Sequence, residues 1–344
     1  MLNSKQKKEI LEHLEKAQNP IFYFDNDPDG LCSFLLLQRF IGRGKGVAIK
    51  GEMMGNYFRK VQELNSDYVF ILDKPLVTKE FFEEVEKVNV PVVWIDHHEI
   101  DRSIVPDFVN YYNPFFNKPS SNEPVTAFCY DLTKKKEDMW LAVAGCVSDA
   151  FVPDFYSEFM KKYPDLGLIS EKAFDILYGS QIGKIAMIFS HALKDKTTNV
   201  VNMLRFLMKV KTPYEVLEET NKNKTMHERY NQINKKIKEL ADRAEVQQEK
   251  ILFFKYGGEL SFSSELSNEL WYRFPKKIIV VAYVKGNKVN ISLRGKNIKK
   301  DFLKVIGDIE GAKGGGHDNA VGAQIKFDDL EKFKRNLSDL VEPK

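Results

Sequence analysis

Short apolar runs that end abruptly in acidic side chains constrain this chain more than any other feature. The runs at residues 20–24, 67–72 and 90–95 are each followed directly by an aspartate, and the third continues as Asp96-His97-His98-Glu99. Runs of this length between turn signals are typical of buried strands in a parallel sheet. Helical patterns lie between them, which predicts right-handed crossovers and an α/β fold with a parallel sheet covered by helices on both faces.

The predicted strand ends should bring polar side chains together. Ligands of open α/β sheets bind beyond the carboxyl ends of the strands, and parallel strands have these ends at one edge. The side chains expected to converge there are Asp25, Asp27, Asp29, Asp73, Asp96, His97 and His98. Imidazole and carboxylate groups are common metal ligands. The sequence therefore predicts a metal site at this edge.

Residues 25–30, with the sequence DNDPDG, predict a tight acidic loop before a buried helix at 31–40. Three carboxylates within five residues repel one another on a bare surface, and a cation removes that penalty. A solvated turn is the alternative, because Asp and Asn are common in turns. We favour metal binding because other strand ends supply matching ligands.

Asp149 ends a predicted helix in the small-residue stretch GCVSD, which permits close packing near a crowded site. Taken alone, it is an ordinary helix cap or a satisfied core aspartate; beside the other clusters it becomes a candidate ligand. His191 and His227 are isolated, and we interpret them as surface or core residues. Asn and Pro predict a loop at residues 111–114.

A glycine run, Gly314-Gly315-Gly316, precedes His317 in the C-terminal part of the chain. Successive glycines let backbone amides face an anion, and His317 can donate to a phosphate. A flexible linker is the alternative. The next residues, AVGAQIKF, predict a strand, so we interpret the run as a phosphate-binding loop inside a domain. Arg294, at a predicted strand end, is a second phosphate-binding candidate, with a surface arginine as its alternative.

The length of 344 residues suits two domains. We expect a metal-binding catalytic domain at 1–225, with a helical segment at 154–225, a polar connecting helix at 226–250, and a smaller α/β substrate-binding domain at 251–344 across a cleft. The net charge of +3 neither requires nor excludes a nucleic-acid partner.

Targeting signals are not apparent in the sequence. No run of about 18 apolar residues predicts a membrane span, and the N-terminus lacks the apolar stretch of a secretory signal. The three cysteines are widely spaced and fit neither a zinc pattern nor a disulfide framework. We therefore expect a cytoplasmic protein with buried free thiols.

Five motifs in order carry a resemblance to a known family: DNDPDG at 25–30, Asp73, DHH at 96–98, Asp149 in GCVSD, and GGGHDNAVG at 314–322. Together they resemble the DHH superfamily of phosphoesterases with its associated C-terminal domain, which includes RecJ-type exonucleases, nano-RNases and cyclic-dinucleotide phosphodiesterases. The latter two groups commonly begin the first motif with His and carry a further Asp where Leu31 stands. The form found here is similar to the RecJ branch, and the short chain resembles a minimal, archaeal-style RecJ.

The resemblance implies two divalent cations, typically Mn²⁺ with Mg²⁺ as an alternative. It implies the metal ligands Asp25, Asp27, Asp29, Asp73, His97 and Asp149. Which of the first three touch metal directly stays open. Asp73 would bridge the metals, Asp96 would orient a histidine, and His98 would face the substrate phosphate. Arg294, Gly314, Gly315, Gly316 and His317 resemble the family's nucleotide-holding groups.

The expected activity is two-metal hydrolysis of phosphodiester bonds at single-stranded DNA or RNA ends, or in short oligonucleotides. Two alternatives stay open. One is a phosphatase for a small nucleotide, such as 3′-phosphoadenosine 5′-phosphate or a cyclic or linear dinucleotide. The other is a non-catalytic partner of replication or RNA-processing proteins. A homodimer is compatible with each of them.

Overall fold

The computed structural model describes residues 1–121, 123–244 and 250–341. The chain divides into two compact units, Met1–Asn231 and Gln232–Lys344. The division falls within helix α12 (Lys224–Asp242). The predicted connecting helix at 226–250 corresponds to α12, which ends at Asp242, and residues 245–249 of the predicted range lie outside the described residues.

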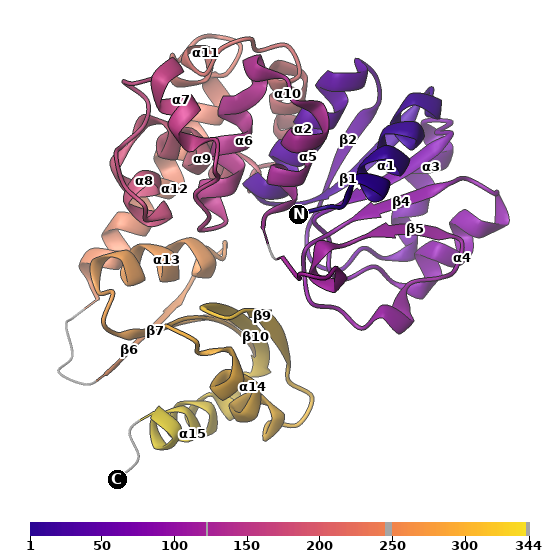
Figure 1. Ribbon diagram of the computed structural model, residues 1–344. Helices are drawn as coiled ribbons and strands as arrows, with labels where there is room; N and C mark the ends of the chain where they lie inside the picture. The colour runs from indigo at the N-terminus through magenta and orange to yellow at the C-terminus, as the bar shows by residue number, and fades with distance from the viewer. Residues whose placement is uncertain (122, 245–249, 342–344) are drawn as a thin grey trace. The chain divides into compact units, whose positions relative to one another are not determined.

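The first unit begins with a five-stranded parallel sheet (Figure 1), which confirms the predicted fold class. The strands lie in the order β2-β1-β3-β4-β5. The elements of this part are α1 (Ser4–Lys16), β1 (Pro20–Asp25), α2 (Pro28–Ile41), β2 (Lys45–Ile49), α3 (Phe58–Glu63), β3 (Tyr68–Leu72), α4 (Lys79–Lys87), β4 (Val92–Ile95) and β5 (Val109–Tyr112). The expected loop at 111–114 was wrong in part, because Tyr111 and Tyr112 belong to β5.

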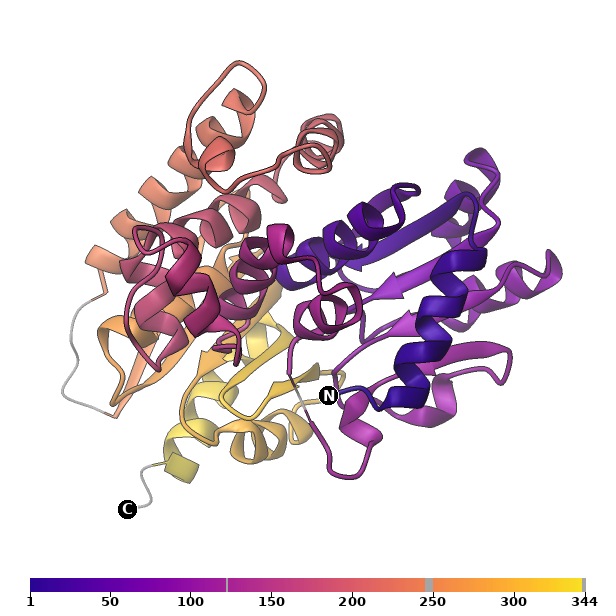
Figure 2. The same cartoon turned by 45° about the horizontal axis from the view of Figure 1, so that its top comes forward.

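Helices cover both faces of this sheet (Figure 1 and Figure 2) because alternate strand residues point to opposite sides. Phe22 and Phe24 of β1 share one core with the apolar residues of α1 and α2. Ile21 and Tyr23 share the other core with α3 and α4. A strand buried on both faces reads as a continuous apolar run, which is why the sequence pattern identified it.

A helical layer completes the first unit. It consists of α5 (Val125–Thr133), α6 (Met139–Ser148), α7 (Tyr156–Lys162), α8 (Ala173–Gly179), α9 (Gln181–Ala192), α10 (Thr197–Leu207), α11 (Tyr214–Leu217) and the first part of α12. Helix α2 packs against both α5 and α6. This layer therefore extends the core from α2, and α2 connects it to the sheet.

The second unit contains a mixed five-stranded sheet in the order β6-β7-β8-β10-β9. Its elements are β6 (Ile251–Gly257), α13 (Ser263–Arg273), β7 (Ile278–Lys285), β8 (Lys288–Arg294), α14 (Lys299–Gly307), β9 (Lys313–His317), β10 (Ala320–Lys326) and α15 (Leu330–Val341). Strands β7 and β8 form a hairpin, and Gly286 adopts a φ of 59° in its two-residue turn. Helices α14 and α15 share one core with this sheet, and α13 shares the other.

Within the described parts of the chain, no helix combines the length and the apolar character needed to cross a lipid bilayer.

Candidate metal centre

The carboxyl ends of neighbouring strands lie in register at one edge of the first sheet. Phe24 of β1 pairs with Leu72 of β3, Leu72 pairs with Ile95 of β4, and Ile95 pairs with Tyr112 of β5. The next residue along each strand is Asp25, Asp73, Asp96 or Asn113. The register thus places polar side chains in a row at this edge, as the sequence pattern predicts for the first three.

His97 lies among three carboxylates that come from different parts of the chain. Its Nε2 is 3.2 Å from Asp73 Oδ1 and 3.9 Å from an oxygen of both Asp29 and Asp149. The ligand atoms of Asp29, His97 and Asp149 all lie within 4.8 Å of one another. Nitrogen and oxygen donors at this spacing fit a divalent cation such as Mn²⁺ or Mg²⁺.

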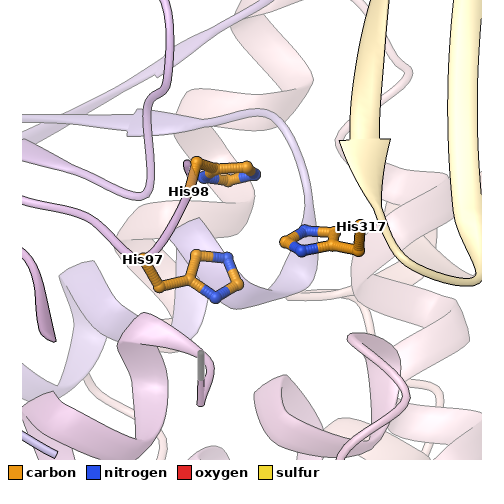
Figure 3. A group of neighbouring side chains, drawn as sticks. All are labelled: His97, His98 and His317. Atoms are coloured by element: carbon orange, nitrogen blue, oxygen red, sulfur yellow. The ribbon is translucent and has the colours of Figure 1, made fainter. Parts of the chain in front are cut away.

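A second group of ligand atoms within the same distance consists of Asp73, Asp96 and His98. His98 Nδ1 is 2.8 Å from Asp96 Oδ1. The rings of His97 and His98 meet edge to face, with centroids 4.5 Å apart (Figure 3). Both histidines lie near Asp73 Oδ1, at 3.2 Å from His97 Nε2 and 3.7 Å from His98 Nδ1, and their other carboxylate neighbours differ.

The three aspartates of the first motif have different partners. Asp27 caps the N-terminus of α2, where its Oδ1 accepts a hydrogen bond from Gly30 N. Asp29 accepts from the backbone amides of Val125 and Thr126, at the start of α5. Asp25 receives the ammonium of Lys74, with Nζ 2.6 Å from Oδ1. Asp25 was expected to bind metal, but Lys74 competes for the same carboxylate, and the sequence did not indicate this contact.

Small residues allow this crowding. A Cβ on Gly30 would lie 2.6 Å from the carbonyl oxygen of Asp25, so the loop can close back on β1 only with glycine here. A Cβ on Gly145 would lie 2.4 Å from Thr126 Oγ1 and 2.9 Å from Cys32 Cβ. Helix α6 therefore packs closely enough to place Asp149, the residue after its last turn, beside His97.

Burial and mutual repulsion make the carboxylates hard to ionise. Desolvation, followed by the charges of Asp25 and Asp29, raises the pKa of Asp27 to about 8. Burial, followed by the charges of Asp29 and Asp27, also holds the pKa of Asp73 well above its usual range. A bound cation would stabilise the ionised carboxylates, so the residues present fit a metal.

For His97 and Asp96, the neighbouring charges outweigh the effect of burial on the pKa. Burial alone lowers the pKa of His97, but the hydrogen bond to Asp73 and the charges around it hold that pKa well above its usual value. Burial alone raises the pKa of Asp96, but His98 outweighs it and the pKa is lowered. Asp96 is therefore the carboxylate of this group that stays ionised beside a histidine.

Two residues at the end of β5, Tyr111 and the following Asn113, are linked to His98, and sequence reasoning missed both. Asn113 donates from Nδ2 to the carbonyl oxygen of His98 at 2.8 Å, and to the hydroxyl of Tyr111 at 2.7 Å. The Asn113 carbonyl oxygen accepts from Phe115 N. The available signal was an Asn-Pro pair after a half-apolar run, which was interpreted as a loop instead of the end of a strand.

In the second unit, Arg294 is the last residue of β8 and is buried. Its Nε donates to Asn268 Oδ1 at 2.6 Å, and its Nη2 donates to Ser264 Oγ at 3.0 Å. Both partners belong to α13, so this helix fixes the plane of the guanidinium group.

The glycine run in this unit lies in a strand, and the predicted loop was wrong. Gly314, Gly315, Gly316 and His317 belong to β9, which pairs with β10 at the edge of the sheet. A Cβ on Gly314 would lie 2.6 Å from Gly322 O, and one on Gly316 would lie 2.4 Å from Ala320 O. The close approach of β10 thus accounts for these glycines. The ladder with β10 uses one side of β9, which is an edge strand of this sheet. His317, drawn in Figure 3, ends the strand.

Comparison with known proteins agrees with this geometry. Residues 247–342 match the DHHA1 domain family. RecJ from Thermus thermophilus, solved with Mn²⁺, superposes with a TM-score of 0.66 at 15% sequence identity, over 97% of this chain and 53% of that one. The fold is that of RecJ-like DHH proteins. The resemblance drawn from the five motifs is confirmed.

Other solved structures share the RecJ-like fold. An exonuclease RecJ bound to manganese matches with a TM-score of 0.63 and 14% identity, over 99% of this chain and 95% of that one. CDC45 from Entamoeba histolytica matches with a TM-score of 0.52 and 12% identity, over 98% of each chain. None of the curated proteins matches the sequence. The chain spans about half the length of the Thermus RecJ.

Proposed function

We propose that this chain is a metal-dependent phosphodiesterase that hydrolyses the ends of single-stranded DNA or RNA, or short oligonucleotides. The observation that carries the proposal is the buried cluster in which His97 Nε2 lies within 3.9 Å of carboxylate oxygens from three separate segments. The RecJ-like fold supports a phosphoester substrate, since a DHHA1 domain follows the cluster in the chain.

The residues proposed to hold divalent cations are the first-motif aspartates with Asp73, His97 and Asp149. Asp73 contacts His97 and also belongs to the group with Asp96 and His98, so it would be the ligand shared by two bound ions. Bound divalent cations supply Lewis acidity at the phosphate and lower the pKa of water.

His98 is the proposed contact to the phosphoryl oxygens. The contact between His98 Nδ1 and Asp96 Oδ1, at 2.8 Å, orients the ring and leaves Nε2 directed away from Asp96. His98 is partly exposed, whereas Asp96 is fully buried. The pair can therefore stabilise negative charge that develops on a phosphate, and Asn113 keeps the His98 backbone in place.

For the second unit, we propose that Arg294, the backbone of residues 314–316, and His317 hold a nucleotide. A guanidinium group recognises phosphate through two parallel hydrogen bonds, and α13 already orients it.

The decisive experiment is a time course with Mn²⁺ on DNA and RNA oligonucleotides of several lengths, labelled at either the 5′ or the 3′ end. Successive shortening from one end supports the proposal and gives the polarity. Cleavage of 3′-phosphoadenosine 5′-phosphate or of dinucleotides alone, with longer strands intact, would assign a small-nucleotide phosphatase. Metal binding without cleavage of any substrate would leave a binding partner as the function. An Asp73→Asn protein controls for contaminating nucleases.

A further inference from the structure

Lys74 is a buried cation beside the proposed metal centre, and the proposed mechanism does not use it. It directly follows Asp73 and is only 3% exposed. Its ammonium lies 2.6 Å from Asp25 Oδ1, and its carbonyl oxygen accepts a hydrogen bond from Trp94 Nε1 at 3.0 Å. A buried ammonium is costly without a partner, so the pairing with Asp25 stabilises this arrangement.

Asp25 differs from the other carboxylates of the centre. Its Oδ1 accepts both the Lys74 ammonium and the backbone amide of Asn26. Its side chain is 28% exposed, against 3% for Asp29. Among the described residues of the first unit, Asp25 belongs to neither of the two groups whose ligand atoms lie within 4.8 Å of one another. Asp27 also lies outside both groups, so the ammonium and the exposure are what set Asp25 apart.

The formal charges lead to the same conclusion. Among the carboxylates of the centre, Asp96 is paired with His98 and Asp25 with Lys74. Asp27, Asp29, Asp73 and Asp149 remain, and four carboxylates balance two divalent cations. Without Lys74, a fifth carboxylate would be left to attract more positive charge to the same small volume.

We infer that Lys74 is a built-in counter-cation that takes Asp25 out of the metal-ligand set and thereby limits how strongly the centre holds exchangeable metal. This inference rests on the proposed function in one respect, that the centre binds divalent cations. It changes the expectation for Asp25: the residue holds Lys74, and the metal ligands are Asp27, Asp29, Asp73, His97 and Asp149.

The test is a double-mutant cycle on metal binding, with Lys74→Met, Asp25→Asn and the double variant in the full chain. Mn²⁺ affinity and stoichiometry are measured by titration calorimetry and by elemental analysis of the loaded protein. Lys74→Met removes a nearby positive charge and frees a carboxylate, so Mn²⁺ should bind on the order of tenfold more tightly, or with one additional ion. Asp25→Asn leaves the ammonium uncompensated, so binding should weaken by a similar factor.

The double variant decides between the two roles of Asp25. If Asp25 only holds Lys74, the double variant removes one charge of each sign and should bind Mn²⁺ within about twofold of the unmodified protein. If Asp25 is a metal ligand, the double variant should be as defective as Asp25→Asn, and the inference is overturned. Unchanged binding by Lys74→Met also overturns it. Thermal unfolding of each metal-free variant confirms that it is folded.

These outcomes are separate from the proposed function. Tight Mn²⁺ binding that follows the predicted cycle, without cleavage of any nucleotide, would support the counter-cation and reject the hydrolase. Cleavage of nucleotides, with the same Mn²⁺ affinity in the parent protein and all variants, would support the hydrolase and reject the counter-cation. A parent protein that binds no Mn²⁺ would reject both.

Discussion

The carboxyl edge of the first sheet and the end of β8 in the second unit both carry buried charged side chains, but their neighbours differ. At the first edge, carboxylates lie close to one another, and burial with mutual repulsion raises the pKa of Asp27 and Asp73. At the end of β8, Arg294 donates to the amide of Asn268 and the hydroxyl of Ser264. The first arrangement brings together carboxylates that a cation would stabilise, whereas the second is held in place by its own helix. Loading with metal should therefore change the first unit more than the second.

The largest effect is expected from Asp73→Asn. Asp73 contacts His97 and belongs to the second ligand group, so its loss should abolish tight Mn²⁺ binding and lower hydrolysis by at least about a thousandfold. Calorimetric titration with Mn²⁺ and oligonucleotide cleavage provide the two measurements. Asp107→Asn, at an exposed position in the same unit, is the matched control. Full activity and full metal content in Asp73→Asn would refute the bridging role.

Arg294→Lys should affect substrate binding and leave metal binding intact. Lysine keeps the charge but loses the planar group that Asn268 and Ser264 hold, so KM should rise between about 10- and 100-fold with little change in kcat. Steady-state kinetics on a short oligonucleotide separate the two constants. Arg273→Lys is the matched control, because Arg273 lies in the same unit, pairs with Asp242 and Glu269, and has no role in the proposal. A loss of Mn²⁺ binding in Arg294→Lys would contradict the contrast between the units.

Asn113→Ala should give a smaller loss at the first edge. Without the hydrogen bond to the His98 carbonyl, His98 should be positioned less well and kcat should fall about tenfold, whereas Mn²⁺ binding should be retained. Asn110→Ala removes a hydrogen bond made by β5, the strand that Asn113 follows, and is the matched control. Equal losses in the two variants would show that Asn113 acts through the stability of β5 alone.

The smallest effect concerns stability. Since the folded pKa of Asp27 is about 8 and thus raised, the folded metal-free protein binds more protons than the unfolded chain between about pH 4 and pH 8, and its stability falls as pH rises through this range. The raised pKa of His97 acts in the same direction, because its stabilising charge is lost as pH rises.

The Tm of EDTA-treated protein should therefore be about 5 °C lower at pH 8.5 than at pH 6, and Mn²⁺ should remove the difference. Asp27→Asn preserves the helix cap and should flatten the dependence. A Tm that rises with pH in EDTA would mean that the carboxylates do not repel one another as described.

Part of the site could be predicted from the sequence because it depends on local patterns. Asp73 and His97 follow continuous apolar runs, and parallel strands bring such ends together by necessity. Lys74 was equally visible, yet its partner lies 49 residues away and only the pairing of β1 with β3 brings them into contact. Asn113 was missed because the strand before it is short and only half apolar.

The glycine run shows a different limit. Residues 314–316 have the composition of a loop, and only β10, which lies beyond them in sequence, makes them a strand. Strand formation at an edge depends on the partner more than on the intrinsic preference of the residues. The fold class was predictable for the complementary reason, since buried strands and amphipathic helices leave periodic patterns of their own.

The tight packing around Gly145 has a consequence for how this protein tolerates change. Helix α6 contains only apolar and small residues up to Ser148, and a methyl group on Gly145 would collide with Thr126 and Cys32. A substitution as mild as glycine to alanine would push the helix outward and carry Asp149 away from His97. A change at Gly145, which carries no ionisable side chain, would therefore disrupt the proposed metal centre.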